Sequence, residues 1–287
     1  MIVSPMIQAT PSPKPPPPLL KVENLRTYFP LRRGILQRTC GFIKAVDDVS
    51  FEVFRGRTLG LIGESGCGKT TIGRTLLRLI PSTAGRALFE GVNIFEIPRS
   101  QMRPLRRKMQ IIFQDTAGSL NPRMRVGKIV AEPLEVHGLS SGPALRAQVE
   151  DLLERCGLSR HAADRYPHEF SGGQRQRIGI ARALAVKPML IICDEPTSAL
   201  DVSIQAQILN LLKDLQDELG VSYLFISHDM GVIRHICDRV AVMQKGRIVE
   251  QGDRDQIIDE PRHEYTKSLL RAVPRVYGRL HAASSAP

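Results

Sequence analysis

A glycine-rich turn between a strand pattern and a helix pattern constrains this chain more than any other feature. Residues 58–80 have the sequence TLGLIGESGCGKTTIGRTLLRLI. The apolar run at 59–62 predicts a short strand, and the turn at 63–70 fits G-x-x-x-x-G-K-[ST], a phosphate-binding loop, in the strand-before, helix-after context that this motif requires. The segment therefore predicts a nucleotide site in an α/β fold. The apolar residues that recur at helical spacing after the turn are Ile72, Leu76, Leu77 and Ile80.

The residue types of this loop match the chemistry of phosphate binding. Glycines let the backbone wrap closely around phosphate oxygens with its N–H groups pointing inward. Lys69 supplies a mobile cation for the β- and γ-phosphates, Thr70 supplies a hydroxyl ligand for Mg²⁺, and the helix adds its positive N-terminal end. The alternative is a glycine-rich turn without a ligand, and the complete motif disfavours it. The predicted ATP-binding residues of the loop are Gly63, Glu64, Ser65, Gly66, Cys67, Gly68, Lys69, Thr70 and Thr71.

Composition and charge narrow the class of protein. The chain has 287 residues, of which 42% are hydrophobic, enough for one large domain or two small ones. No run approaches the roughly 18 apolar residues of a membrane-spanning helix, so we expect a cytoplasmic protein that reaches a membrane only through partners. The net charge of +11 suggests nucleic acid, anionic lipid or acidic ligands as partners. Aromatic residues do not interleave with the basic ones, so a solvated basic face is favoured over a nucleic-acid surface.

The cysteine pattern predicts reduced thiols. Cys67 lies in the phosphate loop beside a helix N-terminus and Lys69, conditions that lower the pKa of a thiol. We therefore expect alkylation of Cys67 that ATP blocks; the alternative is that Cys67 is only a small residue that fits. Cys193, in a predicted central strand, should be inert. The five cysteines are far apart and form no C-x-x-C pair, which disfavours disulfides and a zinc site: Cys40, Cys67, Cys156, Cys193 and Cys237.

The N-terminal part predicts a tail followed by strands. Residues 1–18 end in KPPPP, and proline removes backbone donors and fixes φ, so this tail is expected to be disordered. A strand and loop over 19–29 precede a basic insert at 31–41, and alternating apolar residues at 46–53 predict strands with one buried face. Phe29 stands where an aromatic ring could stack on adenine, with Tyr28 as the second candidate. A core aromatic is the competing interpretation of this position.

Strand and helix patterns alternate through the rest of the chain, which predicts an α/β architecture with a parallel sheet. Helical segments between 115 and 170 interrupt this alternation and predict an inserted subdomain. An amphipathic helix over 202–219 is expected to end at Gly220. Around these helices the sequence predicts a short strand with a turn over 86–94, strands at 108–114, 189–194 and 221–227, and a hairpin whose strands are 240–243 and 247–249.

Two carboxylates and a histidine complete the predicted catalytic set. The apolar strand MLIIC ends in Asp194 and Glu195. The two can take different tasks, with Asp194 holding Mg²⁺ and Glu195 polarising the attacking water as general base. His228 lies at the end of the next strand, which is where ligands bind in an α/β sheet. The remaining histidines are interpreted as structural or surface residues.

A second glycine pair, in the segment FSGGQRQR at 170–177, decides between nucleotide-binding families. With it, the chain resembles the ATP-binding cassette (ABC) ATPases over residues 19 to about 255. Small residues at a helix N-terminus offer a hydroxyl and N–H groups to a γ-phosphate, and in this family they act on the nucleotide held by the opposite subunit. Phe170 replaces the usual leucine of the signature LSGGQ. The matching signature residues are Ser171, Gly172, Gly173 and Gln174.

The resemblance implies roles for the other motifs. Gln114 matches the Q-loop glutamine, Asp201 belongs to the D-loop at 198–201, and His228 matches the switch histidine. The family fold is a RecA-like P-loop NTPase core with an antiparallel β subdomain and an inserted α-helical subdomain, here at about 116–171. Its catalytic residues would be Glu195, His228 and Gln114, and its Mg²⁺ ligands would be Thr70, Gln114 and Asp194.

Three stretches outside these motifs look like the ATPase subunits of oligopeptide/dipeptide importers. They are FQDTAGSLNPRMRVG at 113–127, DVSIQAQILNLL at 201–212 and HEYTKSLLRAVP at 263–274. The basic insert also fits the second ATPase of a heterodimeric pair. Thr116 and Glu264 replace prolines that are usual in the subgroup, and no cysteine follows Cys237, so the iron–sulfur cluster of some relatives is not expected. Residues 256–287 are predicted to form the C-terminal extension of this subgroup.

The resemblance implies an ATPase that powers peptide uptake from a peripheral position on the cytoplasmic face of the inner (plasma) membrane. Its cofactors would be ATP and Mg²⁺. Its partners would be a second ABC ATPase subunit, identical or different, two membrane permeases and an extracytoplasmic peptide-binding protein, with no nucleic acid. The alternative is a soluble ABC ATPase acting on nucleic acid or ribosomes, a class that usually carries two cassettes or long insertions. A nucleotide kinase or GTPase would leave SGGQ and DEPTSALD unexplained.

Overall fold

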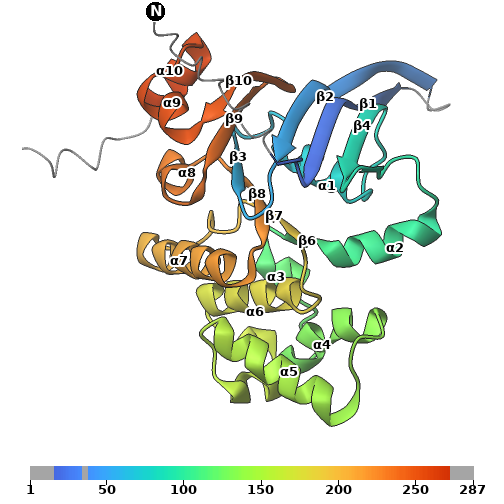
Figure 1. Cartoon of the computed structure of the whole chain (residues 1–287), viewed down its shortest axis with the longest axis vertical. Coiled ribbons are helices and arrows are strands. Elements are labelled where there is room, and N and C mark those ends of the chain that lie inside the picture. Colours follow the sequence, from blue (N-terminus) through green and yellow to red (C-terminus); the bar gives the residue numbers. More distant parts are fainter. Residues whose placement is uncertain (1–15, 34–37, 272–287) are drawn as a thin grey trace, which may run out of the picture.

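The structure, a computed structural model, describes residues 16–33 and 38–271. The chain forms a six-stranded sheet and a four-stranded sheet, with helices gathered mainly around the larger one (Figure 1). The tail predicted at 1–18 lies outside the described residues except for 16–18. The tip of the basic insert and the end of the predicted C-terminal extension also lie outside them.

The larger sheet has the strand order β10-β9-β3-β8-β7-β6. Neighbouring strands pair in parallel from β9 through β3, β8 and β7 to β6, whereas β10 pairs antiparallel with β9. Parallel neighbours need crossover connections, which the helices between them supply. The α/β fold predicted from the sequence is confirmed. The strands are β3 Thr58–Ile62, β6 Met109–Ile112, β7 Leu190–Asp194, β8 Ser222–Ser227, β9 Arg239–Gln244 and β10 Arg247–Asp253.

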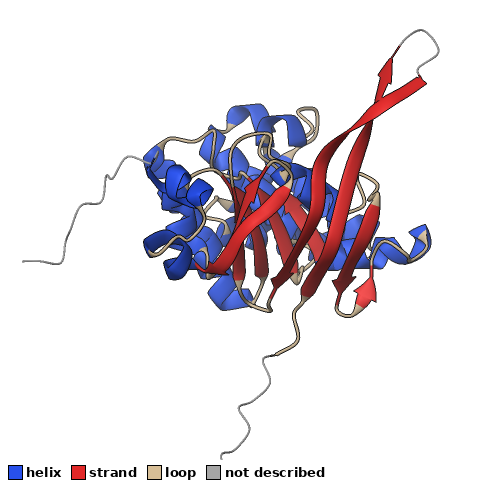
Figure 2. Cartoon of the chain, turned by 90° about the horizontal axis from the view of Figure 1, so that it is seen from above, coloured by secondary structure: helices blue, strands red, loops and turns tan. Residues whose placement is uncertain are grey.

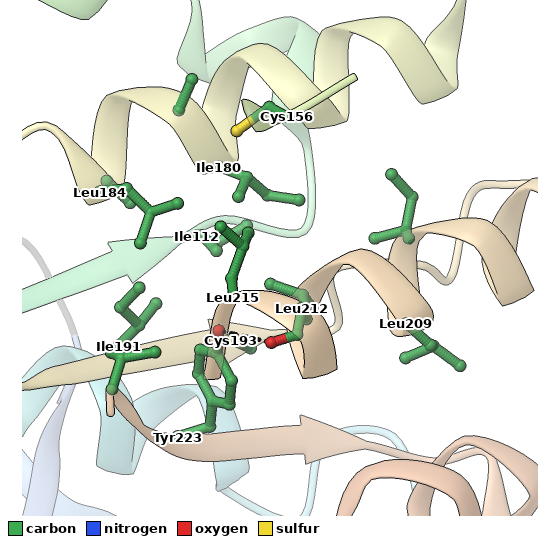
Figure 3. Close-up of a cluster of buried hydrophobic side chains, with 14 of the residues drawn as sticks. Ile112, Cys156, Ile180, Leu184, Ile191, Cys193, Leu209, Leu212, Leu215 and Tyr223 are labelled. Carbon is green, nitrogen blue, oxygen red and sulfur yellow. Dashed lines mark hydrogen bonds between the residues drawn. The ribbon is translucent and has the colours of Figure 1, made fainter. Parts of the chain in front are cut away.

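Two hydrophobic cores lie on opposite faces of this sheet, because successive side chains of a strand point to opposite faces. In β8, Tyr223 and Phe225 belong to one core, whereas Leu224 and Ile226 belong to the other. The first core continues into the helices over that face, where the Tyr223 hydroxyl donates a hydrogen bond to the Leu212 carbonyl at 2.9 Å (Figure 3). A sheet covered on both faces needs apolar strands throughout, which explains the continuous apolar runs in the sequence.

The four-stranded sheet is antiparallel, in the order β2-β1-β4-β5. Figure 2 shows its long β1–β2 hairpin projecting from the body of the molecule. The sequence prediction of a strand followed by a loop within 19–29 was wrong for the loop, because β1 continues as strand through Phe29 to Arg33 and pairs with β2 from Arg38. The strands are β1 Leu20–Arg33, β2 Arg38–Val53, β4 Ala84–Phe89 and β5 Val92–Asn93.

The helices fall into groups along the chain. Most of those between β6 and β7 pack on one another at one end of the molecule (Figure 1). In this group the Thr116 hydroxyl hydrogen-bonds to the buried side chain of Gln176. This bond joins the segment after Gln114 to helix α6. The helices of the group are α3 Thr116–Ser119, α4 Val126–Val136, α5 Gly142–Arg155, η1 Arg160–Asp164, η2 Pro167–Glu169 and α6 Gly172–Leu184.

The remaining helices connect strands or follow the last one. The helix expected over 202–219 has these bounds, and Gly220 ends it with a φ of 67°. A left-handed residue at this position is what a helix C-terminus commonly uses. Within the described chain, no helix is both long enough and apolar enough to cross a membrane. These helices are α1 Lys69–Leu76, α2 Arg99–Lys108, α7 Val202–Leu219, α8 Met230–Ile236, α9 Arg254–Asp259 and α10 Glu264–Arg271.

Asp47 joins the two sheets. Its carboxylate accepts a hydrogen bond from the Tyr28 hydroxyl and two from Arg247, at 2.7 and 3.2 Å, and its backbone N–H donates to the Gly246 carbonyl at 2.8 Å. The hydrogen bonds from Tyr28 and Arg247 lower the pKa of Asp47 to about 2. The Gly246 N–H also donates to the carbonyl of Cys67 in the phosphate loop, so Gly246 connects Asp47 to that loop.

Asp47→Asn is expected to lower stability at neutral pH and to matter less in acid. A carboxylate whose pKa is lowered on folding contributes stability above its unfolded pKa of about 3.9, and this contribution is lost as the pH falls toward 2. The difference in urea midpoint between wild type and variant should therefore be constant above about pH 5 and shrink between about pH 4 and pH 2. Asp217→Asn, which changes an exposed carboxylate on α7, is the control. A difference for Asp47→Asn that stays constant down to pH 2 would contradict this role.

Candidate active site

The phosphate loop connects β3 to α1, and its shape depends on two glycines. Gly63 has a φ of 152° and Gly68 a φ of 110°, a region that other residues rarely adopt. A Cβ atom at Gly63 would lie 2.1 Å from the Met243 carbonyl oxygen, and one at Gly68 would lie 2.1 Å from the Ala45 carbonyl oxygen. Both positions therefore need glycine for conformation and for space, because the loop packs against β2 and β9.

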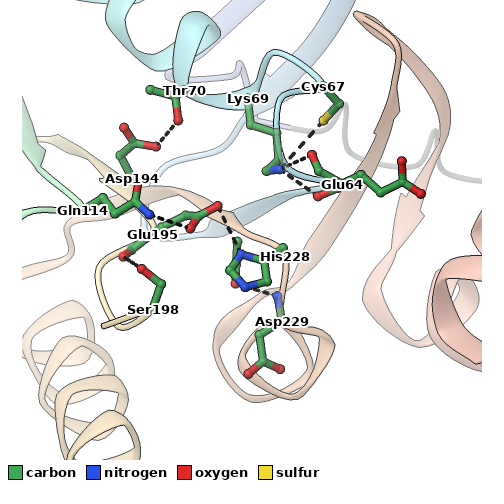
Figure 4. Close-up of polar contacts among 12 residues, drawn as sticks. Glu64, Cys67, Lys69, Thr70, Gln114, Asp194, Glu195, Ser198, His228 and Asp229 are labelled. Carbon is green, nitrogen blue, oxygen red and sulfur yellow. Dashed lines mark hydrogen bonds and ion pairs between the residues drawn. The ribbon is translucent and has the colours of Figure 1, made fainter. Parts of the chain in front are cut away.

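Lys69 and Thr70, the first residues of α1, turn their polar ends toward the loop and the sheet. The Lys69 ammonium is buried and donates to the carbonyls of Gly63, at 2.7 Å, and Glu64, at 2.8 Å. The Thr70 hydroxyl donates to Asp194 Oδ1 at 2.7 Å (Figure 4). The loop thus holds a cation beside its own backbone, and the hydroxyl lies beside a carboxylate from β7.

A pocket of about 170 Å³ lies over the loop and holds many of the predicted site residues. Gln114 and Glu195, which are distant in sequence, reach the same pocket as the loop. Glu64, Cys67 and Gly63 are in the loop without lining the pocket. The lining residues are Ala45, Ser65, Gly66, Gly68, Lys69, Thr70, Thr71, Gln114 and Glu195.

The carboxylate of Glu195 is held by two neighbouring side chains. Its Oε2 accepts a hydrogen bond from Gln114 Nε2 at 3.1 Å, and its Oε1 lies 3.2 Å from Nδ1 of His228 (Figure 4). Its backbone φ is 47°, a left-handed conformation that costs a non-glycine residue about 1–2 kcal/mol. Such strain is characteristic of residues that a site needs in one orientation. The carboxylate is 12% exposed, so it faces the pocket without being freely hydrated.

Asp194 is 2% exposed, at the C-terminal end of β7. Burial raises its pKa, and the hydrogen bond from Thr70 opposes this rise. Thr70 and Asp194 present hydroxyl and carboxylate oxygens, which are the donors that Mg²⁺ takes when phosphates supply further ligands. The donor set therefore fits a Mg²⁺ ion bound together with a nucleotide.

The predicted signature residues lie elsewhere in the chain. Ser171 is the N-cap of α6: its hydroxyl accepts from the Gln174 N–H at 3.3 Å, and the Gln174 side chain accepts from the Ser171 N–H at 3.0 Å. Gly173 packs so close to α7 that a Cβ would lie 2.4 Å from Ile204. In the described chain, none of residues 171–174 lines the pocket, and neither do Phe29 and Asp201.

Comparison with known proteins assigns the chain to a family. Residues 46–198 match the family described as ABC transporter, and residues 249–287 match the oligopeptide/dipeptide transporter C-terminal region. The oligopeptide transport ATP-binding protein OppF of Bacillus subtilis is 53% identical over 258 residues, which cover 89% of this chain and 82% of that relative. The chain belongs to the ABC transporter family.

Other relatives agree with this assignment. The glutathione import ATP-binding protein GsiA of Escherichia coli is 55% identical over 257 residues, which cover 90% of this chain and 41% of that relative. Among solved structures, a dimeric ATP-binding cassette in a post-hydrolysis state with ADP and Pi has a TM-score of 0.72 at 28% identity, covering 82% of this chain and 98% of that one. The predicted ABC ATPase fold and ATPase class are confirmed.

In this ABC ATPase, the expectation of a low pKa for Cys67 was wrong. The thiol is buried, with Sγ 3.8 Å from the Lys69 ammonium. Burial raises the pKa of Cys67 more than the nearby Lys69 lowers it. The sequence places a cation beside the thiol, but it does not show that the loop turns the side chain inward. Burial also raises the pKa of Cys193, as expected for an inert thiol in a central strand.

Two contacts at the site of this ABC cassette could not be predicted from the sequence. Ala45 lines the pocket from β2, and a small apolar residue carries no motif that could identify it. Tyr265 of α10 accepts a hydrogen bond from the Glu64 N–H at 3.1 Å. Tyr265 lies in the stretch 263–274, which resembles the importer subgroup. That resemblance does not predict a contact with the phosphate loop.

Proposed function

We propose that this ABC ATPase powers the uptake of short peptides. The observation that carries the proposal is the match of residues 249–287 to the C-terminal region of oligopeptide/dipeptide transporters, together with 53% identity to an oligopeptide transport ATP-binding protein. Glutathione, named for a second relative, is itself a short peptide. The chain would act from the cytoplasmic face of the membrane, with two permease subunits and an extracytoplasmic peptide-binding protein.

We propose that the pocket over the phosphate loop binds ATP and Mg²⁺. Lys69, held beside the loop by the Gly63 and Glu64 carbonyls, would direct its ammonium at the β- and γ-phosphates, while the loop N–H groups surround the phosphates. Mg²⁺, held by Thr70, Asp194 and Gln114, would neutralise charge on the phosphates. Glu195 would polarise the attacking water as general base, and its contact with His228 would keep its carboxylate turned toward the pocket.

The pocket would be completed by a second ATP-binding subunit. The exposed N-terminus of α6 offers the Ser171 hydroxyl and backbone N–H groups, the kind of site that binds a phosphate. Since residues 171–174 do not line the pocket of their own chain, they would act on the nucleotide of the other subunit. The neighbouring Asp201 segment would lie at the same interface. Phe29, 37% exposed on β1, would stack on the adenine.

Deletion of the gene is expected to abolish uptake of labelled tripeptides or longer peptides. Wild-type protein should restore uptake, Lys69→Ala should not, and Lys213→Ala, which removes an exposed lysine of α7, should restore it fully. Uptake is measured as cell-associated label over time, with a free amino acid as the control cargo. Unchanged peptide uptake in the deletion strain would refute the proposal. Salt-sensitive DNA binding by the purified chain would instead favour the nucleic-acid alternative.

A further inference from the structure

We infer that Tyr265 is a positioning residue for the phosphate loop, linking the C-terminal helix α10 to the site where ATP is proposed to bind. The Tyr265 hydroxyl accepts a hydrogen bond from the Glu64 N–H at 3.1 Å across 201 residues of sequence. The ring is 9% exposed and belongs to the larger hydrophobic core. The inference rests on the proposed nucleotide site and adds a residue that none of its motifs contains.

The contact falls on one particular peptide group. The Gly63 carbonyl and the Glu64 N–H are the two polar ends of the same planar unit. The carbonyl end accepts from the Lys69 ammonium at 2.7 Å, and the N–H end donates to Tyr265 at 3.1 Å. Rotation of this peptide would break both bonds, so the tyrosine hydroxyl fixes the plane whose carbonyl positions the lysine.

The segment that carries Tyr265 is held in turn by strand β10 of the six-stranded sheet. Glu250 of β10 accepts hydrogen bonds from the backbone N–H groups of Arg262, at 2.8 Å, and His263, at 3.1 Å, just before α10 begins. The Tyr265 N–H then donates to Nδ1 of His263 at 3.1 Å. Because β10 pairs with β9, and β9 with β3, the loop and the helix that holds it are anchored in the same sheet.

The contact joins two regions of the chain that match different family models. Tyr265 lies in the C-terminal region, residues 249–287, whereas the general ABC transporter match covers residues 46–198 and includes the phosphate loop. The C-terminal region thus contributes a direct restraint to a site that the cassette core otherwise builds. Displacement of α10 would release that restraint and weaken nucleotide binding.

Tyr265→Phe removes one oxygen atom and keeps the packed ring. A hydrogen bond contributes about 0.5–1.5 kcal/mol, so the dissociation constant for ATP is expected to rise about two- to tenfold. The rate of hydrolysis at saturating ATP should change less than twofold, because Glu195, Gln114 and His228 are untouched. Both quantities are measured on the purified full-length chain, by calorimetric titration with ATP and by phosphate release.

The matched control is Tyr223→Phe. Tyr223 is also buried, and its hydroxyl bonds to the Leu212 carbonyl beneath α7. Both variants should lower the urea midpoint, but only Tyr265→Phe should weaken ATP binding. Equal ATP affinities in wild type and Tyr265→Phe would overturn the inference and leave Tyr265 as a packing residue.

The buried thiol of Cys67 supplies a second readout inside the loop. In a Cys40→Ser background, which removes the exposed cysteine, N-ethylmaleimide should label Cys67 several times faster in Tyr265→Phe than in the parent protein. Tyr223→Phe should leave the rate unchanged. Equal labelling in all three proteins would count against loop positioning. The outcome is independent of cargo: a chain that shows these effects without supporting peptide uptake would refute the proposed function and retain this inference.

Discussion

Replacing Glu195 with glutamine is expected to lower the rate of ATP hydrolysis by about 10²- to 10⁴-fold, the usual contribution of a general base. Glutamine has nearly the same shape as glutamate, so the contacts with Gln114 and the packing beside His228 can persist. The amide cannot accept a proton from water at neutral pH. ATP affinity should change less than threefold, because the loop residues that surround the phosphates are unaltered.

Measurements of turnover and of ATP binding distinguish a general-base role of Glu195 from a structural role. Phosphate release gives kcat, titration with ATP gives the dissociation constant, and size-exclusion chromatography with ATP shows whether a dimer accumulates when hydrolysis is slow. Glu218→Gln makes the same chemical change on an exposed carboxylate near the end of α7 and should leave all three unchanged. Wild-type turnover in Glu195→Gln would remove Glu195 from the mechanism.

The parts of the fold that follow from local pattern could be predicted from the sequence. The helix over 202–219 has apolar residues at helical spacing and a glycine where a left-handed residue ends it, and the structure gives it the same bounds. The phosphate loop has the same local character, since its glycines, lysine and threonine are consecutive. The position of Glu195 beside the loop could be predicted because it directly follows β7, and the carboxyl ends of parallel strands lie at the same edge of a sheet.

Tertiary contacts set the limit of this prediction. The inward turn of the Cys67 side chain raises the pKa of a thiol that its neighbours along the chain would lower. Strand pairing in the basic insert depends on register between β1 and β2, which composition does not reveal. The contact between Tyr265 and Glu64 joins segments 201 residues apart, and neither segment has a sequence pattern that predicts contact with the other. In each case the deciding partner comes from a distant part of the sequence.

A comparison of two glycines in the phosphate loop tests whether packing or conformation makes the loop intolerant of side chains. Gly66 and Gly68 both have positive φ, at 79° and 110°, so alanine at either costs about 1–2 kcal/mol in backbone strain. The two positions differ in the room available for a Cβ atom. A Cβ at Gly66 would meet no atom within 4 Å, whereas one at Gly68 would lie 2.1 Å from the Ala45 carbonyl oxygen and 2.8 Å from the Met243 methyl carbon.

Gly68→Ala is therefore expected to destabilise the protein by about 2–5 kcal/mol, since overpacking adds about 1–3 kcal/mol to the strain of about 1–2 kcal/mol. Gly66→Ala should cost only the strain. Urea unfolding gives both values, and titration with ATP tests the site, because β2 and the start of α1 must separate to admit the Gly68→Ala methyl group. Equal losses in the two variants would show that backbone conformation alone governs the loop. A larger loss at Gly68 would show that the contact with β2 holds the phosphate loop in its binding shape.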